Sequence, residues 1–218
     1  MENITQAKQF QVFEKLINYK FKNKLLLKSA LSHPSKKNIK EYDYQRLEFL
    51  GDSVLNFIVT KYLILKYPNM NEGELTYKRA NIINRKTLAK SATALSLNKY
   101  ILTGNSINTI TEKILCDTYE ALIGAITLDS TIKNISFFIH KTLLDNIKQY
   151  ETKTNHKGKL IELCRFKKIV LPKYYTTKEN NHFISKVAFD KNKQTYYGVG
   201  KTKKEAEDIV SKEILKKL

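Results

Sequence analysis

Four carboxylates stand out because they form two pairs, each spaced so that both side chains share one face of a helix. Glu48 and Asp52 are four residues apart, and Asp117 and Glu120 are three apart. Like charges at these spacings repel each other unless something neutralises them. Both pairs lie in strongly apolar sequence. We therefore expect each pair to lie near a core rather than on an open surface.

Carboxylates contributed by two packed helices would form an oxygen-rich pocket of the kind that hard divalent cations such as Mg²⁺ bind. A cation there can lower the pKa of a water molecule and hold a phosphodiester oxygen. The alternative is that the acids form structural ion pairs with basic residues such as Arg46, Arg79 or Arg85. For a single acid that alternative is preferred. For two same-face pairs in apolar helices, a metal site is the better interpretation.

The charge of the chain points to a polyanionic partner, nucleic acid first and an anionic membrane second. The formal net charge is +18. Residues 151–218 contain 17 Lys and Arg against 8 Asp and Glu, a net charge of +9, and residues 1–150 have the same net charge over more than twice the length. A compositional bias toward Lys, Asn and Ile explains part of the excess, but it does not explain the denser C-terminal third. Together, the acids and the basic surface suggest hydrolysis of a nucleic-acid backbone.

The segments that carry the acids are predicted to be helices. In residues 1–148, apolar residues recur at helical spacing and alternating strand patterns are almost absent, so we predict an all-α domain. The predicted helices after the N-terminal one are Leu25–Leu31, Arg46–Tyr67, Glu74–Leu97, Ile114–Leu128 and Ser136–Ile147. The two acidic pairs therefore fall on the third and fifth helices of the domain.

The pattern changes after a polar segment, residues 149–156, which we interpret as a linker. Residues 157–218 predict a small α+β domain of order α-β-β-β-α. Its elements are a helix at Leu160–Lys168, strands at Tyr174–Thr177, His182–Asp190 and Thr195–Gly200, and a helix at Thr202–Leu218. Thr202 is the expected N-cap, with Glu205 completing a capping box.

Other features of the chain exclude several classes of protein. Cys116 and Cys164 lack the spacing of a zinc site or a disulfide framework, so we expect two buried, free thiols. No stretch is long and apolar enough for a membrane span, and the N-terminus does not have the pattern of a secretory leader. We expect a cytoplasmic protein with no membrane partner and no small-molecule organic cofactor.

The motifs around the acids resemble those of the ribonuclease III family. The segment R-L-E-F-L-G-D-S-V-L at 46–55 resembles the family signature, which is long and highly specific. Three further blocks follow the family order: A-L-S-H-P-S at 30–35, E-G-E-L-T at 72–76 and D-T-Y-E-A-L-I-G-A-I at 117–126. The C-terminal region resembles a double-stranded-RNA-binding domain through P-K-Y at 172–174, H-F at 182–183 and G-V-G-K-T-K-K-E-A-E at 198–207.

The resemblance implies roles for individual residues of the first domain. The metal-binding acids would be Glu48, Asp52, Asp117 and Glu120, with Asp52 and Glu120 catalytic. Glu72 would be an accessory acid near the cleavage site, although an ordinary solvated glutamate at a helix start is a fair alternative. Phe49 would contact the partner subunit of a homodimer, or it would pack in the core.

One position departs from the family pattern. Gln45 stands where the family usually has Glu, and a neutral amide cannot supply the same charge to a metal or to water. Because the four acids of the core set are intact, we expect activity to survive with an altered rate or metal demand.

In the second domain, the resemblance assigns duplex RNA binding to one acid, one histidine and four basic residues: Glu162, Arg165, His182, Lys201, Lys203 and Lys204. Lysines beside a helix N-terminus suit phosphate binding, although a solvated helix face is the alternative. Glu179 and Asn180 replace the Gly-Pro that usually precedes the histidine, so we expect a shortened loop.

We thus expect a homodimeric, Mg²⁺-dependent endonuclease for double-stranded RNA, with Mn²⁺ as a possible substitute. The resemblance implies 5′-phosphate ends, short 3′ overhangs and a role in processing rRNA or mRNA precursors. A catalytically idle duplex-RNA binder is the first alternative, for which Gln45 is the only hint. A generic basic DNA-binding protein is the second, but it does not explain the paired carboxylates.

Overall fold

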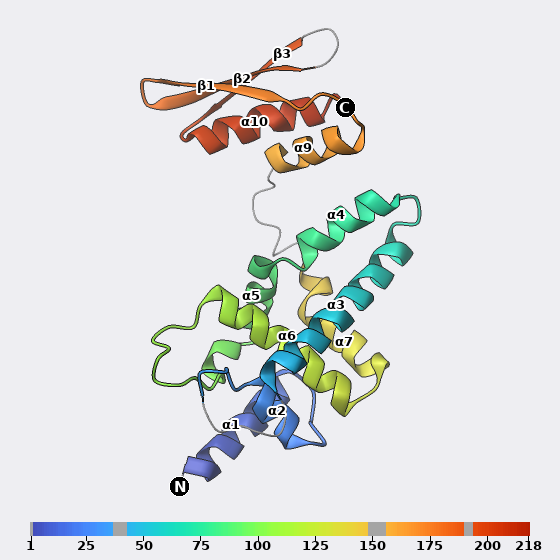
Figure 1. Cartoon of the computed structure of the whole chain (residues 1–218), viewed down its shortest axis with the longest axis vertical. Coiled ribbons are helices and arrows are strands. Elements are labelled where there is room, and N and C mark those ends of the chain that lie inside the picture. Colours follow the sequence, from blue (N-terminus) through green and yellow to red (C-terminus); the bar gives the residue numbers. More distant parts are fainter. Residues whose placement is uncertain (1, 37–42, 148–155, 190–193) are drawn as a thin grey trace. The chain divides into compact units, whose positions relative to one another are not determined.

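The computed structural model describes residues 2–36, 43–147, 156–189 and 194–218, in two compact units, Met1–Glu151 and Thr152–Leu218. The first unit is helical in all its described elements, which confirms the predicted class (Figure 1). These elements are α1 (Glu2–Leu16), α2 (Lys24–Ala30), α3 (Tyr44–Lys66), α4 (Glu72–Ile82), α5 (Arg85–Ala94), η1 (Leu97–Lys99), α6 (Glu112–Asp129), α7 (Ile132–Thr142) and η2 (Leu144–Asn146). None of the described helices is both long and apolar enough to span a membrane.

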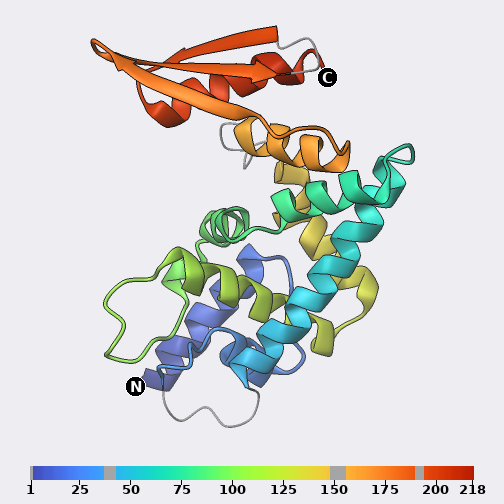
Figure 2. The same ribbon diagram turned by 45° about the horizontal axis from the view of Figure 1, so that its top comes forward.

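The packing of α3 against α6 dominates the first unit, and two glycines allow it (Figure 2). A Cβ atom at Gly51 would lie 1.8 Å from the carbonyl oxygen of Glu120, and one at Gly124 would lie 2.0 Å from that of Leu47. Any larger residue would therefore force the helix backbones apart. Leu55 and Tyr119 are fully buried in the core that these helices share.

Two of the predicted helix boundaries are wrong. The helix predicted at Glu74–Leu97 is two helices, because the backbone of Asn84 is extended and its side chain caps α5 by accepting a hydrogen bond from the Thr87 N–H at 3.0 Å. The helix predicted to begin at Ser136 begins at Ile132, directly after an extended Thr131. The first error arises because the apolar period continues through the break at Asn84, whereas the second prediction omits the first turn of α7 and runs past its end at Thr142.

The second unit contains α9 (His156–Phe166), β1 (Lys173–Glu179), β2 (His182–Phe189), β3 (Gln194–Gly200) and α10 (Lys203–Leu215). The strands form an antiparallel sheet in the order β1-β2-β3, and both helices lie on the same face of it (Figure 1). Leu160, Val187 and Val210 join helices and sheet in a small core. The predicted α-β-β-β-α order is confirmed. Of the proposed linker, residues 149–155 lie outside the described residues, and His156 begins α9.

Local backbone geometry sets the turn between β1 and β2 and the start of α10. Glu179 pairs with His182, so β1 and β2 are joined by two residues, of which Asn180 is in the left-handed region with φ 51°. At α10, Thr202 accepts a hydrogen bond from the Glu205 N–H at 3.2 Å, which confirms the predicted N-cap. The Glu205 carboxylate accepts a bond from the Lys201 N–H at 2.8 Å rather than from Thr202.

Candidate functional site

The contact between α3 and α6 places the two acidic pairs opposite each other. Gly51 lies between Glu48 and Asp52 on α3 and directly against the backbone of Glu120 on α6. Both pairs therefore flank the point where the two helix backbones approach most closely, and the helical spacing of each pair fixes its direction. The sequence predicts each pair, but not the glycine contact that joins them.

The four carboxylates interact strongly through their charges. The pKa of Glu120 is raised to about 7, mainly by burial and then by the charges of Asp52, Glu48 and Asp117, in that order. The pKa of Glu48 is also raised, first by burial and then by Asp117. Repulsion of this kind is relieved when a multivalent cation binds among the acids.

The donor atoms fit a hard divalent cation. Within the described ranges, carboxylate oxygens of Asp117 and Glu120 lie within 4.8 Å of each other and of the Cys116 sulfur. Burial raises the pKa of the Cys116 thiol to about 12, so this group stays neutral beside Glu120, whose Oε1 lies 3.8 Å from the sulfur. Glu48 and Asp52 lie outside this closest group, although their charges reach it. Asp117 and Glu120 would thus form the nucleus of a metal site.

The acids differ in exposure, and for Asp52 the expected position near a core is wrong. Glu48, Asp117 and Glu120 are partly buried, whereas Asp52 is exposed and accepts a hydrogen bond from the Asn56 side chain at 2.9 Å. The cause is helical geometry: the neighbouring Gly51 is the residue that faces α6, which turns Asp52 outward along the rim of the contact.

Three further residues of the first unit lie on the surface or at helix starts. Gln45 is exposed in the first turn of α3. Glu72 is the first residue of α4, and its carboxylate accepts a hydrogen bond from the Thr76 hydroxyl at 2.8 Å. No contact between described residues links Glu72 to the four acids. Phe49 is 78% exposed, so the alternative that it packs in the core of its own chain is wrong.

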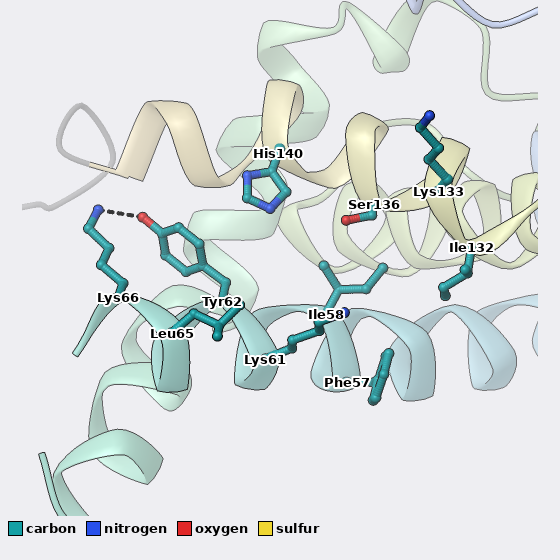
Figure 3. Close-up of a pocket in the computed structure, with 10 residues that line it drawn as sticks. All are labelled: Phe57, Ile58, Lys61, Tyr62, Leu65, Lys66, Ile132, Lys133, Ser136 and His140. Carbon is teal, nitrogen blue, oxygen red and sulfur yellow. Dashed lines mark hydrogen bonds between the residues drawn. The ribbon is translucent and has the colours of Figure 1, made fainter. Parts of the chain in front are cut away.

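A cavity of about 670 Å³ lies between α3 and α7, away from the four acids (Figure 3). Its lining is apolar and basic: Phe57, Ile58, Lys61, Tyr62, Leu65, Lys66, Ile132, Lys133, Ser136 and His140. The Tyr62 and His140 rings meet edge to face at 5.4 Å, and Lys66 donates a hydrogen bond to the Tyr62 hydroxyl. Without a carboxylate among these residues, the cavity lacks the oxygen ligands of a metal site.

In the second unit, the basic residues assigned to RNA are exposed. Lys201, Lys203 and Lys204 surround the N-terminus of α10, where free backbone N–H groups add to their positive charge. Arg165 is exposed in the last turn of α9, and His182 is exposed at the start of β2. The side chain of Glu162 lies outside what the structure describes.

Sequence reasoning missed one basic residue at the acidic cluster. Lys113 on α6 forms an ion pair with Asp117, four residues further along the helix. The i,i+4 spacing of opposite charges was a visible signal. Sequence reasoning also missed the role of Gly51 and Gly124, for which the available signal was a glycine inside a predicted helix, a position that is unfavourable unless packing requires it.

Comparison with known proteins supports the same division of the chain. Residues 23–147 match the family described as ribonuclease-III-like, and residues 156–218 match the double-stranded RNA binding motif. Ribonuclease 3 of Acinetobacter pittii is 38% identical over 93% of this chain and 92% of its own length. Ribonuclease 3 of Aliarcobacter butzleri is 36% identical over 96% of this chain and 97% of its own length.

A solved structure extends the comparison to the fold. The nuclease domain of ribonuclease III from Campylobacter jejuni is 37% identical, with a TM-score of 0.59, over 62% of this chain and 96% of that one. With the two domain matches and the full-length relatives, the likeness identifies this chain as a member of the ribonuclease III family, the endoribonucleases of double-stranded RNA.

Proposed function

We propose that this endoribonuclease uses Glu48, Asp52, Asp117 and Glu120 to hold Mg²⁺, with Mn²⁺ as a substitute, and that Asp52 and Glu120 act directly at the scissile phosphate. The observation that carries this proposal is the close backbone contact at Gly51, which brings both acidic pairs to one place and sets ligand oxygens of Asp117 and Glu120 within 4.8 Å of each other, where burial and three neighbouring carboxylates raise the pKa of Glu120. When bound, a divalent cation supplies a water of lowered pKa and stabilises charge on the phosphate.

The chain's own residues hold this site ready for a cation. The backbone contact at Gly51 fixes the separation of the two helices and therefore of the two pairs. Glu120 is about half protonated near neutral pH in the absence of a cation, and it loses that proton when positive charge arrives. Asp52, held by Asn56 on the exposed rim, is accessible to a nucleic-acid strand.

The second unit would hold the duplex by its shape and phosphates. A-form RNA presents 2′-hydroxyls in a wide minor groove, and its phosphates are read across the narrow major groove. We propose that Lys201, Lys203 and Lys204 contact phosphates, and that Arg165 and His182 reach the adjacent minor grooves. Glu162 is proposed for the same face on the basis of its place in α9 alone.

A homodimer is the proposed active form, with each subunit cutting one strand. Phe49 supports this because its side chain, 78% exposed on α3, is available to contact a partner subunit. The Campylobacter jejuni domain is described as having a region involved in dimer formation. Phe49→Asp is expected to shift the sedimentation profile toward monomer, whereas Phe166→Asp, at another exposed phenylalanine, is the control and is expected to leave it unchanged.

The proposed substrates are structured rRNA and mRNA precursors in the cytoplasm, cut to 5′-phosphate ends with short 3′ overhangs. The test is incubation of a long perfect RNA duplex with Mg²⁺, followed by mapping of both product ends. Short duplexes with these ends support the proposal. Duplex DNA in excess is the competitor, and equal inhibition by RNA and DNA competitors would favour the general nucleic-acid binder instead.

The neutral Gln45 gives a further test of the same site. Because it is exposed in the first turn of α3, Gln45→Glu adds a carboxylate near the acids without disturbing the core. We expect this variant to cut at a lower Mg²⁺ concentration. A wild type that binds duplex RNA tightly without cutting, while Gln45→Glu restores cutting, would support the idle-binder alternative.

A further inference from the structure

We propose that Lys113 is a tethered counter-cation of the acidic cluster, which holds Asp117 in the metal-free protein and must leave it when a divalent cation binds. This inference rests on the proposed metal site. It assigns to a residue outside the four acids the task of setting how much metal the enzyme requires.

Among the described residues, Lys113 is the basic group that forms an ion pair with the cluster, whereas Arg85 acts on it through its charge alone. Of the ion pairs between described residues, the one that involves any of the four acids joins the Lys113 ammonium to Oδ2 of Asp117. The pKa of Lys113 is raised, first by its hydrogen bond to Asp117 and more weakly by the charge of Glu48. The ammonium therefore neutralises part of the charge that a metal would otherwise neutralise.

The Lys113 ammonium is bonded to the carboxylate of Asp117, which is also a proposed ligand of the metal. Oxygens of Asp117 and Glu120 belong to the closest group of potential metal ligands within the described part of the chain. Two cations cannot share one carboxylate oxygen at close range without strong mutual repulsion. A divalent cation bound at Asp117 therefore repels the Lys113 ammonium, and a cation that takes Oδ2 displaces it.

Three features of the Lys113–Asp117 ion pair favour its opening. The Lys113 side chain is 63% exposed while that of Asp117 is 16% exposed, so the lysine can swing into water and the acid stays in place. Lys113 lies in the first turn of α6, where the helix dipole disfavours a positive charge. A lysine that precedes its acid at i,i+4 is also the weaker orientation of such a pair. All three features favour exchange with a stronger cation.

The test measures Mn²⁺ binding to the full chain by electron paramagnetic resonance, without RNA, at pH 7.5. Lys113→Gln is expected to bind Mn²⁺ about two- to fivefold more tightly, the range that loss of a competing exposed ion pair implies. Lys113→Arg, which retains a cation, is expected to stay near wild type. Lys141→Gln is the matched control, because Lys141 at the end of α7 forms an i,i+4 pair with Asp145 of η2 that involves none of the four acids.

Thermal unfolding gives a second measurement. Without metal, Lys113→Gln is expected to unfold at a lower temperature than wild type, because the acids lose their counter-cation. Saturating Mn²⁺ is expected to raise its unfolding temperature by more than it raises that of wild type. Equal or weaker Mn²⁺ binding by Lys113→Gln would overturn the role of Lys113.

Glu120→Gln separates this inference from the proposal beneath it. If wild type binds Mn²⁺ and Glu120→Gln does not, the metal site stands and the comparison at Lys113 decides the inference. If wild type binds no Mn²⁺, or Glu120→Gln binds it equally well, the proposed metal site fails and the inference at Lys113 fails with it.

Discussion

The two units of this protein place their functional groups in opposite ways. In the first unit, acids about 70 residues apart in the sequence meet at a close contact between two helix backbones, where burial and the neighbouring carboxylates raise the pKa of Glu120 to about 7. In the second unit, exposed lysines adjoin one another at a single helix start, set by the local cap at Thr202. The geometry of the proposed metal site therefore depends on long-range packing, whereas the proposed RNA contact depends on local structure and charge.

This difference predicts that packing variants damage catalysis and leave RNA binding intact. Gly51→Ala places a Cβ atom where the Glu120 carbonyl lies, so the helices must separate. We expect the first unit to lose about 3 kcal/mol of stability or more, at the upper end of overpacking effects. Urea unfolding measures the loss.

Ser53→Ala is the control for that variant, because Ser53 is an exposed residue of the same helix. Its effect is expected to stay within about 0.5 kcal/mol. A Gly51→Ala protein with wild-type stability and full activity would show that the close contact does not position the acids.

The complementary change removes charge from the second unit. Replacing Lys201, Lys203 and Lys204 by alanine is expected to weaken duplex RNA binding about 100-fold at moderate salt and to reduce the slope of log affinity against log salt by up to about 3. Mn²⁺ binding is expected to remain unchanged. The matched control replaces Lys212, Lys216 and Lys217, exposed lysines toward the other end of α10. Equal losses in both triple variants would mean that total charge matters and position does not.

The pH dependence of stability tests the electrostatics of the first unit alone. The folded protein releases the Glu120 proton near pH 7 instead of near the ordinary value of 4.5. The unfolded chain thus binds fewer protons between these values, and the free energy of unfolding falls as pH rises through this window. Since Glu120 is partly solvated, we expect a loss of about 2 kcal/mol or less.

The measurement compares urea unfolding of wild type and Glu120→Gln in EDTA at pH 5 and pH 8. Glu120→Gln is expected to show the smaller fall. The same pH dependence in both proteins would contradict the raised pKa of Glu120.

A small, local effect is expected at the cap of α10. Thr202→Ala removes the acceptor for the Glu205 N–H and is expected to cost about 1 kcal/mol in the second unit. Duplex RNA binding is expected to weaken several-fold, because the first turn of α10, which positions the lysines, becomes less stable. Thr202→Asn, another good cap, is expected to restore both properties, and its failure to do so would point to a different role for Thr202.

What the sequence predicted follows the same division between local and long-range structure. Helical spacing and the cap at Thr202 are local, and both acidic pairs and the α-β-β-β-α order were predicted from them. The break at Asn84 was missed because the apolar pattern runs across it. The exposure of Asp52 was missed because it depends on which residue of α3 faces α6, a tertiary property.

The assigned roles of the acids remain proposals, and cleavage of a long RNA duplex tests them together. Wild type and Glu120→Ala would be compared with and without Mg²⁺, with duplex binding measured in parallel. We expect metal-dependent cutting by wild type and a loss of about 1,000-fold or more in the variant, since weakening an outer-shell group alone costs about 10–100-fold. Binding is expected to persist. Full cutting by Glu120→Ala, or cutting by wild type in EDTA, would contradict a metal site built on Glu120.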